Sequence, residues 1–199
     1  YNPSAATPNA VTRHYDPEHD ADIILVSFAD GLGRIVQDKK QISLFKGKNA
    51  EDELRMQVSG TTLFDAFGRT FSEYYPVTEA MGTPTVLNGA TGAPSSTTTF
   101  DVLDRVTQKI LADGAETNVT YSITDQLFSA LTTDALGNAK EIQSDVRGRK
   151  RFFKETGPAG VITTRYDYNA MSELLKVTDN GGNEFTATYD NLGRKTGTT

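Results

Sequence analysis

The side chains best suited to metal chemistry lie near the N-terminus. His14 and His19 fall in an acidic stretch that also holds Asp16, Glu18, Asp20 and Asp22. Imidazole nitrogens and carboxylate oxygens together can bind a divalent cation, which could activate water for hydrolysis. The spacing matches no defined metal motif, however, and short ligand patterns arise readily in polar segments. We therefore predict a solvated acidic loop, no metal site and no cofactor. A metal-dependent hydrolase is an alternative that rests on this cluster alone.

A second set of carboxylates recurs along the chain, at Asp65, Asp101, Asp145 and Asp190. Glycoside hydrolysis requires two carboxylic acids that flank one bond. Each of these aspartates instead opens a turn-like sequence, and their spacing places them in a row along one sheet edge. The turn role explains them without catalysis, so the sequence predicts no catalytic residue and no enzyme.

The turn sequence is clearest at Tyr189-Asp190-Asn191-Leu192-Gly193-Arg194. Asp at the first position of a type I turn accepts hydrogen bonds from N–H groups just ahead, and Gly at the fourth position takes a positive φ. An intact second copy runs from Phe64 to Arg69. Altered copies lie at residues 30–34, after Phe28, and at residues 100–105, 144–149 and 168–173. The predicted repeat turn residues are Asp30, Gly33, Arg34, Asp65, Gly68, Arg69, Asp101, Arg105, Asp145, Gly148, Arg149, Asp190, Gly193 and Arg194.

The spacing of these turns indicates a repeat. Positions 101, 145 and 190 are 44 and 45 residues apart. A second family of turn sequences falls between them, at residues 113–114, 134–138, 157–160 and 179–183. Both families fit a period of about 22 residues, within the range typical of repeat arrays. Each period then holds two strands and two turns, which predicts an all-β array of antiparallel β-hairpins.

Alternating apolar residues divide the chain into three parts. Residues 1–22 are polar and contain three prolines, which predicts a loop or extended arm. Residues 23–99 read as lead-in hairpins with loop insertions: a charged insertion follows Phe45, with a short helix near Asn49 left open, and residues 80–98 read as a long loop. Residues 100–199 alternate most cleanly and are the predicted repeat domain. Such short hairpins are marginal alone and must stack along the array.

The composition excludes several classes of protein. The chain has 199 residues, 37% hydrophobic and 23% charged, which suits a β protein with one solvated face. Its net charge of −6 argues against nucleic acid as a partner, because phosphate binding needs a basic surface. There is no cysteine, no apolar run long enough for a membrane span and no charged-then-apolar leader. The start at Tyr1 suggests an internal piece or a processed product.

The [Tyr/Phe]-Asp-x-x-Gly-Arg unit with its period of about 22 residues resembles the YD, or RHS, repeat. Such repeats occur in bacterial RHS polymorphic toxins, wall-associated proteins, the B and C components of insecticidal Tc toxins, and animal teneurins. The resemblance covers roughly residues 23–199. Residues 27–37 and 58–65 are also similar to the region that leads into the repeats in Tc B components and SpvB-like proteins. Asp104 in place of Gly, and the missing aromatic before Asp145, depart from the pattern.

The resemblance implies a curved, twisted sheet that forms part of a hollow shell around a C-terminal polypeptide. The expected partners are therefore the remainder of the same RHS protein and that enclosed polypeptide, in a secreted or bacterial cell-surface protein. The self-cleaving end of the family carries paired Asp-Pro-x-Gly motifs. The single Asp-Pro here, Asp16-Pro17, has a different context, so we expect neither autoproteolysis nor cargo in this chain.

Two further expectations concern binding. The tyrosines could stack on sugars, so a carbohydrate- or cell-surface-binding adhesion module is the alternative function; inward-facing strand aromatics more often belong to a core. The candidate stacking residues are Tyr15, Tyr74, Tyr75, Tyr166 and Tyr168. A partial sheet also leaves edge strands unpaired. We therefore expect edge-to-edge self-association, unless residues 1–22 or 80–98 cover the free edge.

Overall fold

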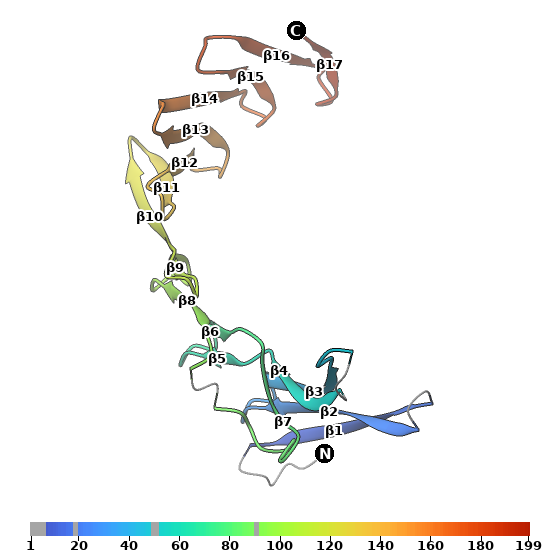
Figure 1. Cartoon of the computed structure of the whole chain (residues 1–199). Helices are drawn as coiled ribbons and strands as arrows, with labels where there is room; N and C mark the ends of the chain where they lie inside the picture. The colour runs from blue at the N-terminus through green and yellow to red at the C-terminus, as the bar shows by residue number, and fades with distance from the viewer. Residues whose placement is uncertain (1–6, 18–19, 49–51, 90–91) are drawn as a thin grey trace. The chain divides into compact units, whose positions relative to one another are not determined.

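The computed structural model describes residues 7–17, 20–48, 52–89 and 92–199 (Figure 1). Every regular element in these ranges is a β-strand, and each strand pair is antiparallel, so the predicted all-β hairpin fold is confirmed. No helix in the described ranges is long and apolar enough to cross a membrane. The chain forms two compact units, which are described separately. Unit 1 comprises residues 1–98 and 111–113, and unit 2 comprises residues 99–110 and 114–199.

Unit 1 contains a five-stranded sheet in the order β1-β2-β3-β4-β7 (Figure 1). A smaller set pairs β5 with β6 and β6 with β8. The strands are β1 (Asn9–Asp16), β2 (Ala21–Ala29), β3 (Ile35–Leu44), β4 (Glu53–Ser59), β5 (Thr62–Phe64), β6 (Thr70–Tyr74), β7 (Val77–Ala80) and β8 (Ser95–Phe100).

The core of unit 1 lies on one face of the five-stranded sheet. Val26 and Phe28 of β2 and Met56 and Val58 of β4 are at most 1% exposed. They share this face because side chains two residues apart on a strand point the same way. Lys39 of β3 is only 2% exposed and lies between Val26 and Val58 in the register. The core therefore contains a buried cation that must find partners.

Unit 2 is a meander in which each strand from β9 to β17 pairs with the next (Figure 1). Its strands are β9 (Val106–Ile110), β10 (Glu116–Thr124), β11 (Leu127–Thr133), β12 (Ala139–Ser144), β13 (Lys150–Gly157), β14 (Gly160–Tyr168), β15 (Leu174–Thr178), β16 (Glu184–Tyr189) and β17 (Lys195–Thr198). Strand and turn alternate as the sequence predicts for residues 100–199.

One face of the unit 2 sheet carries a row of apolar side chains, beside which lies one ion pair, Lys140–Glu155 at 3.4 Å. Tyr121, Ala130, Ile142 and Phe153 are direct cross-strand partners on β10 to β13. On β14 to β16 the same face continues through three further partners, Tyr166, Val177 and Phe185. Cross-strand packing of this kind is the unit of sheet stabilisation.

The opposite face of unit 2 is ionic. Glu141 accepts hydrogen bonds from Ser129 at 2.5 Å and from Lys154 at 3.1 Å. Among the described residues of unit 2, only Ser129 and Ala187 are buried. The sheet is therefore a single layer that no other described element of unit 2 covers, and packing alone cannot fix its hairpins.

Three expectations about segments have different outcomes. Residues 1–22, predicted to be a loop or extended arm, contain β1, which pairs with β2 along its whole length and has only Asn9 buried. Residues 80–98, read as a long loop, include the start of β8. Asn49, near which a short helix is a sequence-based alternative, lies outside the described residues. The free edge at β17, which pairs with β16, leaves edge-to-edge self-association as a prediction.

Backbone strain at the turn glycines can be tested at Gly148, which has φ +76° and open space around an added Cβ. We expect Gly148→Val to lower the free energy of unfolding by about 1–3 kcal/mol, because a β-branched residue resists positive φ. Val146→Thr in the same turn, at a side chain 93% exposed, is the control and should change it by less than about 0.5 kcal/mol. Equal losses of unfolding free energy for the two variants in urea denaturation would contradict the positive φ assigned to Gly148.

Candidate functional site

The recurring Asp turn is the most regular polar site in the chain, and Asp145 illustrates it. The Asp145 Oδ1 accepts hydrogen bonds from the backbone N–H of Arg147 at 3.0 Å and of Arg149 at 3.1 Å. Its Oδ2 accepts the Nε–H of Arg149 at 2.7 Å, and a second guanidinium nitrogen lies 2.7 Å away. One carboxylate therefore satisfies two turn amides and binds the arginine that immediately precedes the next strand, β13.

The same geometry occurs at eight turns of the described residues. In each, the side-chain Oδ1 of the first residue accepts the N–H of the third and fifth residues at 2.8–3.1 Å. The first residues are Asp30, Asp65, Asp101, Asp134, Asp145, Asn169, Asp179 and Asp190. The turns at Asp134 and Asp179, which the sequence assigned to a second family, thus have the geometry of the first.

The structure places all the sequence-derived turn residues within these turns. The fourth residue has a positive φ in each, including the non-glycines Asp104 (φ 60°) and Ser172 (φ 68°). The arginines Arg34, Arg69, Arg105, Arg149 and Arg194 each donate Nε–H to the turn aspartate at 2.7 Å. Where Asn or Glu replaces Arg, the side chain still bonds the first residue, as Asn138 does to Asp134 at 3.0 Å.

One turn was missed by sequence reasoning. Asp125 and Gln126 connect β10 to β11 with φ values of 52° and 64°. Two central residues with positive φ are typical of a type I′ hairpin turn, which usually carries Asn-Gly or Asp-Gly. Gln is not a usual residue for this conformation, so only the Asp could have signalled the turn.

The hydrogen bonds within the turns lower the pKa of the aspartates. At Asp145 the largest cause is the side-chain hydrogen bond from Arg149, and at Asp190 it is the backbone N–H of Arg194. At Asp65 burial raises the pKa, but hydrogen bonds from Arg69 and Phe67 outweigh it, so the pKa is again lowered. A carboxylate used in this way is held as an acceptor, which does not suit a general acid.

The arginine of one turn also contacts an aromatic ring near another. In unit 1 the Arg34 guanidinium lies 3.9 Å from the centre of the Phe64 ring. In unit 2 Arg105 lies 4.1 Å from the ring of Tyr121, and Arg149 lies 5.2 Å from the ring of Tyr168. These are cation–π distances. Phe64 and Tyr168 are the aromatics of later motif copies, so at these two places the arginine of one copy meets the aromatic of another.

Hydrogen bonds to neighbouring turns reinforce this contact. The Arg149 guanidinium donates to the carbonyl of Asn169 at 3.0 Å, and Arg147 donates to the carbonyl of Ala170 at 2.7 Å. Arg149 thus links its own turn, through Asp145, to the turn two strands further along the sheet.

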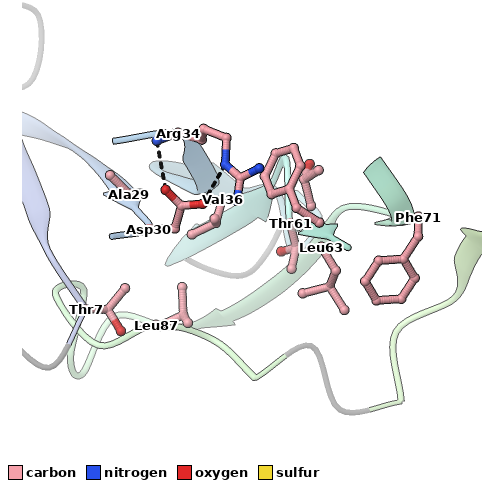
Figure 2. A pocket seen from close by; sticks show the side chains of 11 residues that line it. Thr7, Ala29, Asp30, Arg34, Val36, Thr61, Leu63, Phe71 and Leu87 are labelled. Atoms are coloured by element: carbon pink, nitrogen blue, oxygen red, sulfur yellow. Dashed lines mark hydrogen bonds and ion pairs between the residues drawn. The ribbon is translucent and has the colours of Figure 1, made fainter. Parts of the chain in front are cut away.

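A cleft in unit 1 opens where two strands diverge. The pairing of β3 with β4 ends at Asp38 and Ser59, after which Gly60 redirects the chain into β5. The resulting cavity has a volume of about 510 Å³ (Figure 2). It is lined by Thr7, Ala29, Asp30, Arg34, Val36, Thr61, Thr62, Leu63, Phe64, Phe71 and Leu87.

The lining of this cleft is mainly apolar, as in small-molecule sites. Its charged side chains, Asp30 and Arg34, bind each other, and Figure 2 shows these contacts as dashed lines. The cleft therefore has the size of a ligand site. Its two charged side chains are paired with each other, so neither is left as a free acid or base.

The buried Lys39 belongs to a second polar cluster in unit 1. It forms an ion pair with Glu79 and donates to the carbonyl of Val86 at 2.5 Å. Gln37 bonds the backbone of Asn88 in both directions at 2.9 Å. These bonds fasten the segment around residues 86–88 over the core, which gives the buried cation a structural role.

The acidic and aromatic candidates lie in different surroundings. Glu18 and His19 of the acidic cluster lie outside the described residues, so that cluster remains a sequence-based hypothesis. Within the described residues no group of three His, Cys, Asp or Glu side chains could hold a metal. Tyr15 is 63% exposed on β1, whereas Tyr166 lies under the Lys150 ammonium at 5.6 Å.

Solved structures of Tc toxins have a similar fold. A crystal structure of TcdB2-TccC3 superposes with a TM-score of 0.61 at 17% identity, covering 96% of this chain. The Photorhabdus luminescens Tc holotoxin pore gives 0.59 at 17% identity over 97%. TcdB2-TccC3 without its hypervariable C-terminal region gives 0.57 at 16% identity over 96%.

The chain has the fold of one stretch of a Tc toxin. It spans 12% of the length of each of these toxin chains. No family model matches the sequence, and a search of curated proteins returns no match. The resemblance to Tc toxins predicted from the turn sequences is thus confirmed at the level of the fold.

Two arginines test the importance of the inter-repeat contact. The Arg149 side chain is 20% exposed and has partners in two turns, whereas Arg194 pairs with Asp190 and is 74% exposed. We expect Arg149→Lys to lower the free energy of unfolding by about 1–2 kcal/mol, because lysine cannot form the two-pronged bond or the flat stack. Arg194→Lys should cost less than about 0.5 kcal/mol. Similar losses in urea denaturation would argue against the contact between turns.

The pH dependence of stability tests the turn carboxylate. A lowered folded-state pKa means that Asp145 stabilises the fold above its unfolded pKa of about 3.9, and that this stabilisation is lost as pH falls through the folded pKa. Asp145→Asn should keep the two turn amides bonded, as Asn169 does naturally. The Tm difference between wild type and variant should be largest near pH 7 and vanish near pH 2. A difference that grows on acidification would contradict this account.

Proposed function

We propose that this chain is a non-enzymatic structural module, one section of the β-sheet wall of a larger RHS/YD-repeat protein of the toxin type. The wall would enclose or present a C-terminal polypeptide, in a secreted or cell-surface context. The observation that carries the proposal is the single-layer sheet of unit 2, whose apolar face no described element of that unit covers.

An uncovered apolar face of this extent is unusual for a complete domain, since sheets bury such a face against another layer. Ile142 and Phe185 on this face are 40% and 43% exposed. On the opposite face, Lys154 pairs with Glu141 and Lys176 with Glu184. A wall with polypeptide on one side and water on the other requires this asymmetry.

The fold likeness supports the same proposal. TcdB2-TccC3 chains are far longer than this one, and one of them is described without its hypervariable C-terminal region. The turn carboxylates are committed as hydrogen-bond acceptors to backbone and arginine. These hydrogen bonds support a structural role for the carboxylates, which stabilise the turns of the sheet. The proposed partner is the remainder of the same protein.

Site-specific photo-crosslinking in the protein that contains this chain tests which face meets the polypeptide. A photoreactive residue at Ile142 samples the apolar face, and one at Thr120 samples the ionic face of the same sheet. We expect crosslinks to the C-terminal polypeptide from position 142 and few or none from position 120. Equal crosslinking from both faces, or none from either, would overturn the proposal. Binding to a glycan that Tyr→Ala variants abolish would favour the adhesion module.

A further inference from the structure

The polar cluster around Lys39 brings together the three groups that an intramolecular amide bond requires. These are a primary amine, a carboxamide, and a carboxylate in contact with both. Lys39 donates from Nζ to Glu79 Oε1, and Asn88 donates from Nδ2 to Glu79 Oε2 at 2.5 Å. One carboxylate therefore bridges the nitrogen that would attack and the nitrogen that would leave.

Separate parts of unit 1 hold these side chains together. Lys39 lies in β3, Glu79 lies in β7, and Asn88 lies in the irregular chain that follows β7. Gln37, on the same face of β3 as Lys39, donates to the Asn88 carbonyl and accepts the Asn88 N–H, both at 2.9 Å. The Val86 carbonyl accepts a second hydrogen bond from Nζ at 2.5 Å. The amine and the carboxamide are thus both fixed beside Glu79.

Burial gives Lys39 the surroundings of a reactive amine. Its side chain is 1% exposed, and Nζ lies 5.6 Å from the centre of the Phe28 ring. Its neighbours in the strand register are Val26 and Val58. The site is shielded from bulk water, which would otherwise solvate the ammonium and compete with the amine for the carboxamide. Proton transfer to Glu79 leaves the neutral amine, which is the nucleophilic form.

A similar bridge in unit 2 lacks this shielding. Glu141 accepts a hydrogen bond from Gln143 Nε2 at 2.7 Å and another from Lys154 Nζ at 3.1 Å. The Lys154 side chain is 33% exposed, so its ammonium stays in water. A carboxylate between an amine and an amide is therefore not sufficient, and burial distinguishes the Lys39 site.

We propose that Lys39 and Asn88 form an intramolecular isopeptide bond, with Glu79 as the proton carrier. Glu79 takes one proton from the Lys39 ammonium, and the resulting amine attacks Cγ of Asn88. As the Nζ–Cγ bond forms and the Cγ–Nδ2 bond breaks, Glu79 passes that proton to Nδ2 and takes a second from Nζ. The released ammonia takes up the second proton and leaves as ammonium, so Glu79 ends as a carboxylate. The reaction needs no oxidant and no second substrate.

The bond makes permanent the attachment of the segment around residues 86–88 to β3. It restricts the unfolded chain as a disulfide does, in a sequence that contains no cysteine. The cross-link lies within unit 1 and stands apart from the wall role of unit 2.

Mass spectrometry of the purified full chain under denaturing conditions tests the proposal. We expect an intact mass about 17 Da below that of the sequence, because attack by the amine expels one ammonia. Tryptic digestion should yield residues 35–40 joined to residues 70–105, since an acylated Lys39 is not cleaved. No link should join Lys154 to Gln143.

Three variants assign the reaction to its groups. Lys39→Met and Glu79→Gln should each have the full mass of their sequence, because one lacks the amine and the other lacks the proton carrier. Lys40→Met is the matched control, since Lys40 is exposed on the opposite face of β3. It should retain the mass loss and the linked peptides. Circular dichroism verifies that each variant folds.

Three outcomes would overturn the proposal. The first is a folded wild-type chain that keeps the full mass of its sequence after prolonged incubation. The second is a mass loss confined to residues 70–105 and retained in Lys39→Met, which would indicate a succinimide at Asn88–Gly89. The third is a Glu79→Gln variant that cross-links as fast as the wild type.

Discussion

The hydrogen bonds that one turn carboxylate accepts are the constraint on which the repeat structure depends. In unit 2 the sheet is one layer thick, and among its described residues only Ser129 and Ala187 are buried. The register of each hairpin must therefore be fixed locally, without a packed core. Asp145 does this by accepting two amides of its own turn and the guanidinium of Arg149, which leads into β13. The same arrangement recurs whenever the chain needs this turn.

The motif also explains how repeats adhere to one another. Arg105 and Arg149 are oriented by their own aspartates and then lie on Tyr121 and Tyr168 of later strands. An arginine held by a carboxylate loses less conformational freedom when it stacks, so each contact makes the next more favourable. Stability in such an array comes from many neighbour contacts instead of one core. This permits a thin sheet with an apolar face available to a partner.

The turns could be predicted from sequence because their chemistry is local: Asp at the first position and Gly at the fourth define them. Asp104 and Ser172 depart from Gly yet adopt the same positive φ, since the surrounding hydrogen bonds determine it. The pairing of β4 with β7 and the burial of Lys39 depend on contacts about 20 to 47 residues away, which no local pattern records.

Amide hydrogen exchange at the turn tips tests the central claim most directly. The Arg147 N–H lies at an exposed tip and has no strand partner, but it donates to Asp145 at 3.0 Å. The account predicts that this amide and its equivalents in the other Asp turns exchange more slowly than in an unstructured peptide. In Asp145→Ala the protection should be lost at Arg147 and retained at Leu192, whose acceptor is Asp190. Tip amides that exchange at the free-peptide rate in the wild type would contradict the account.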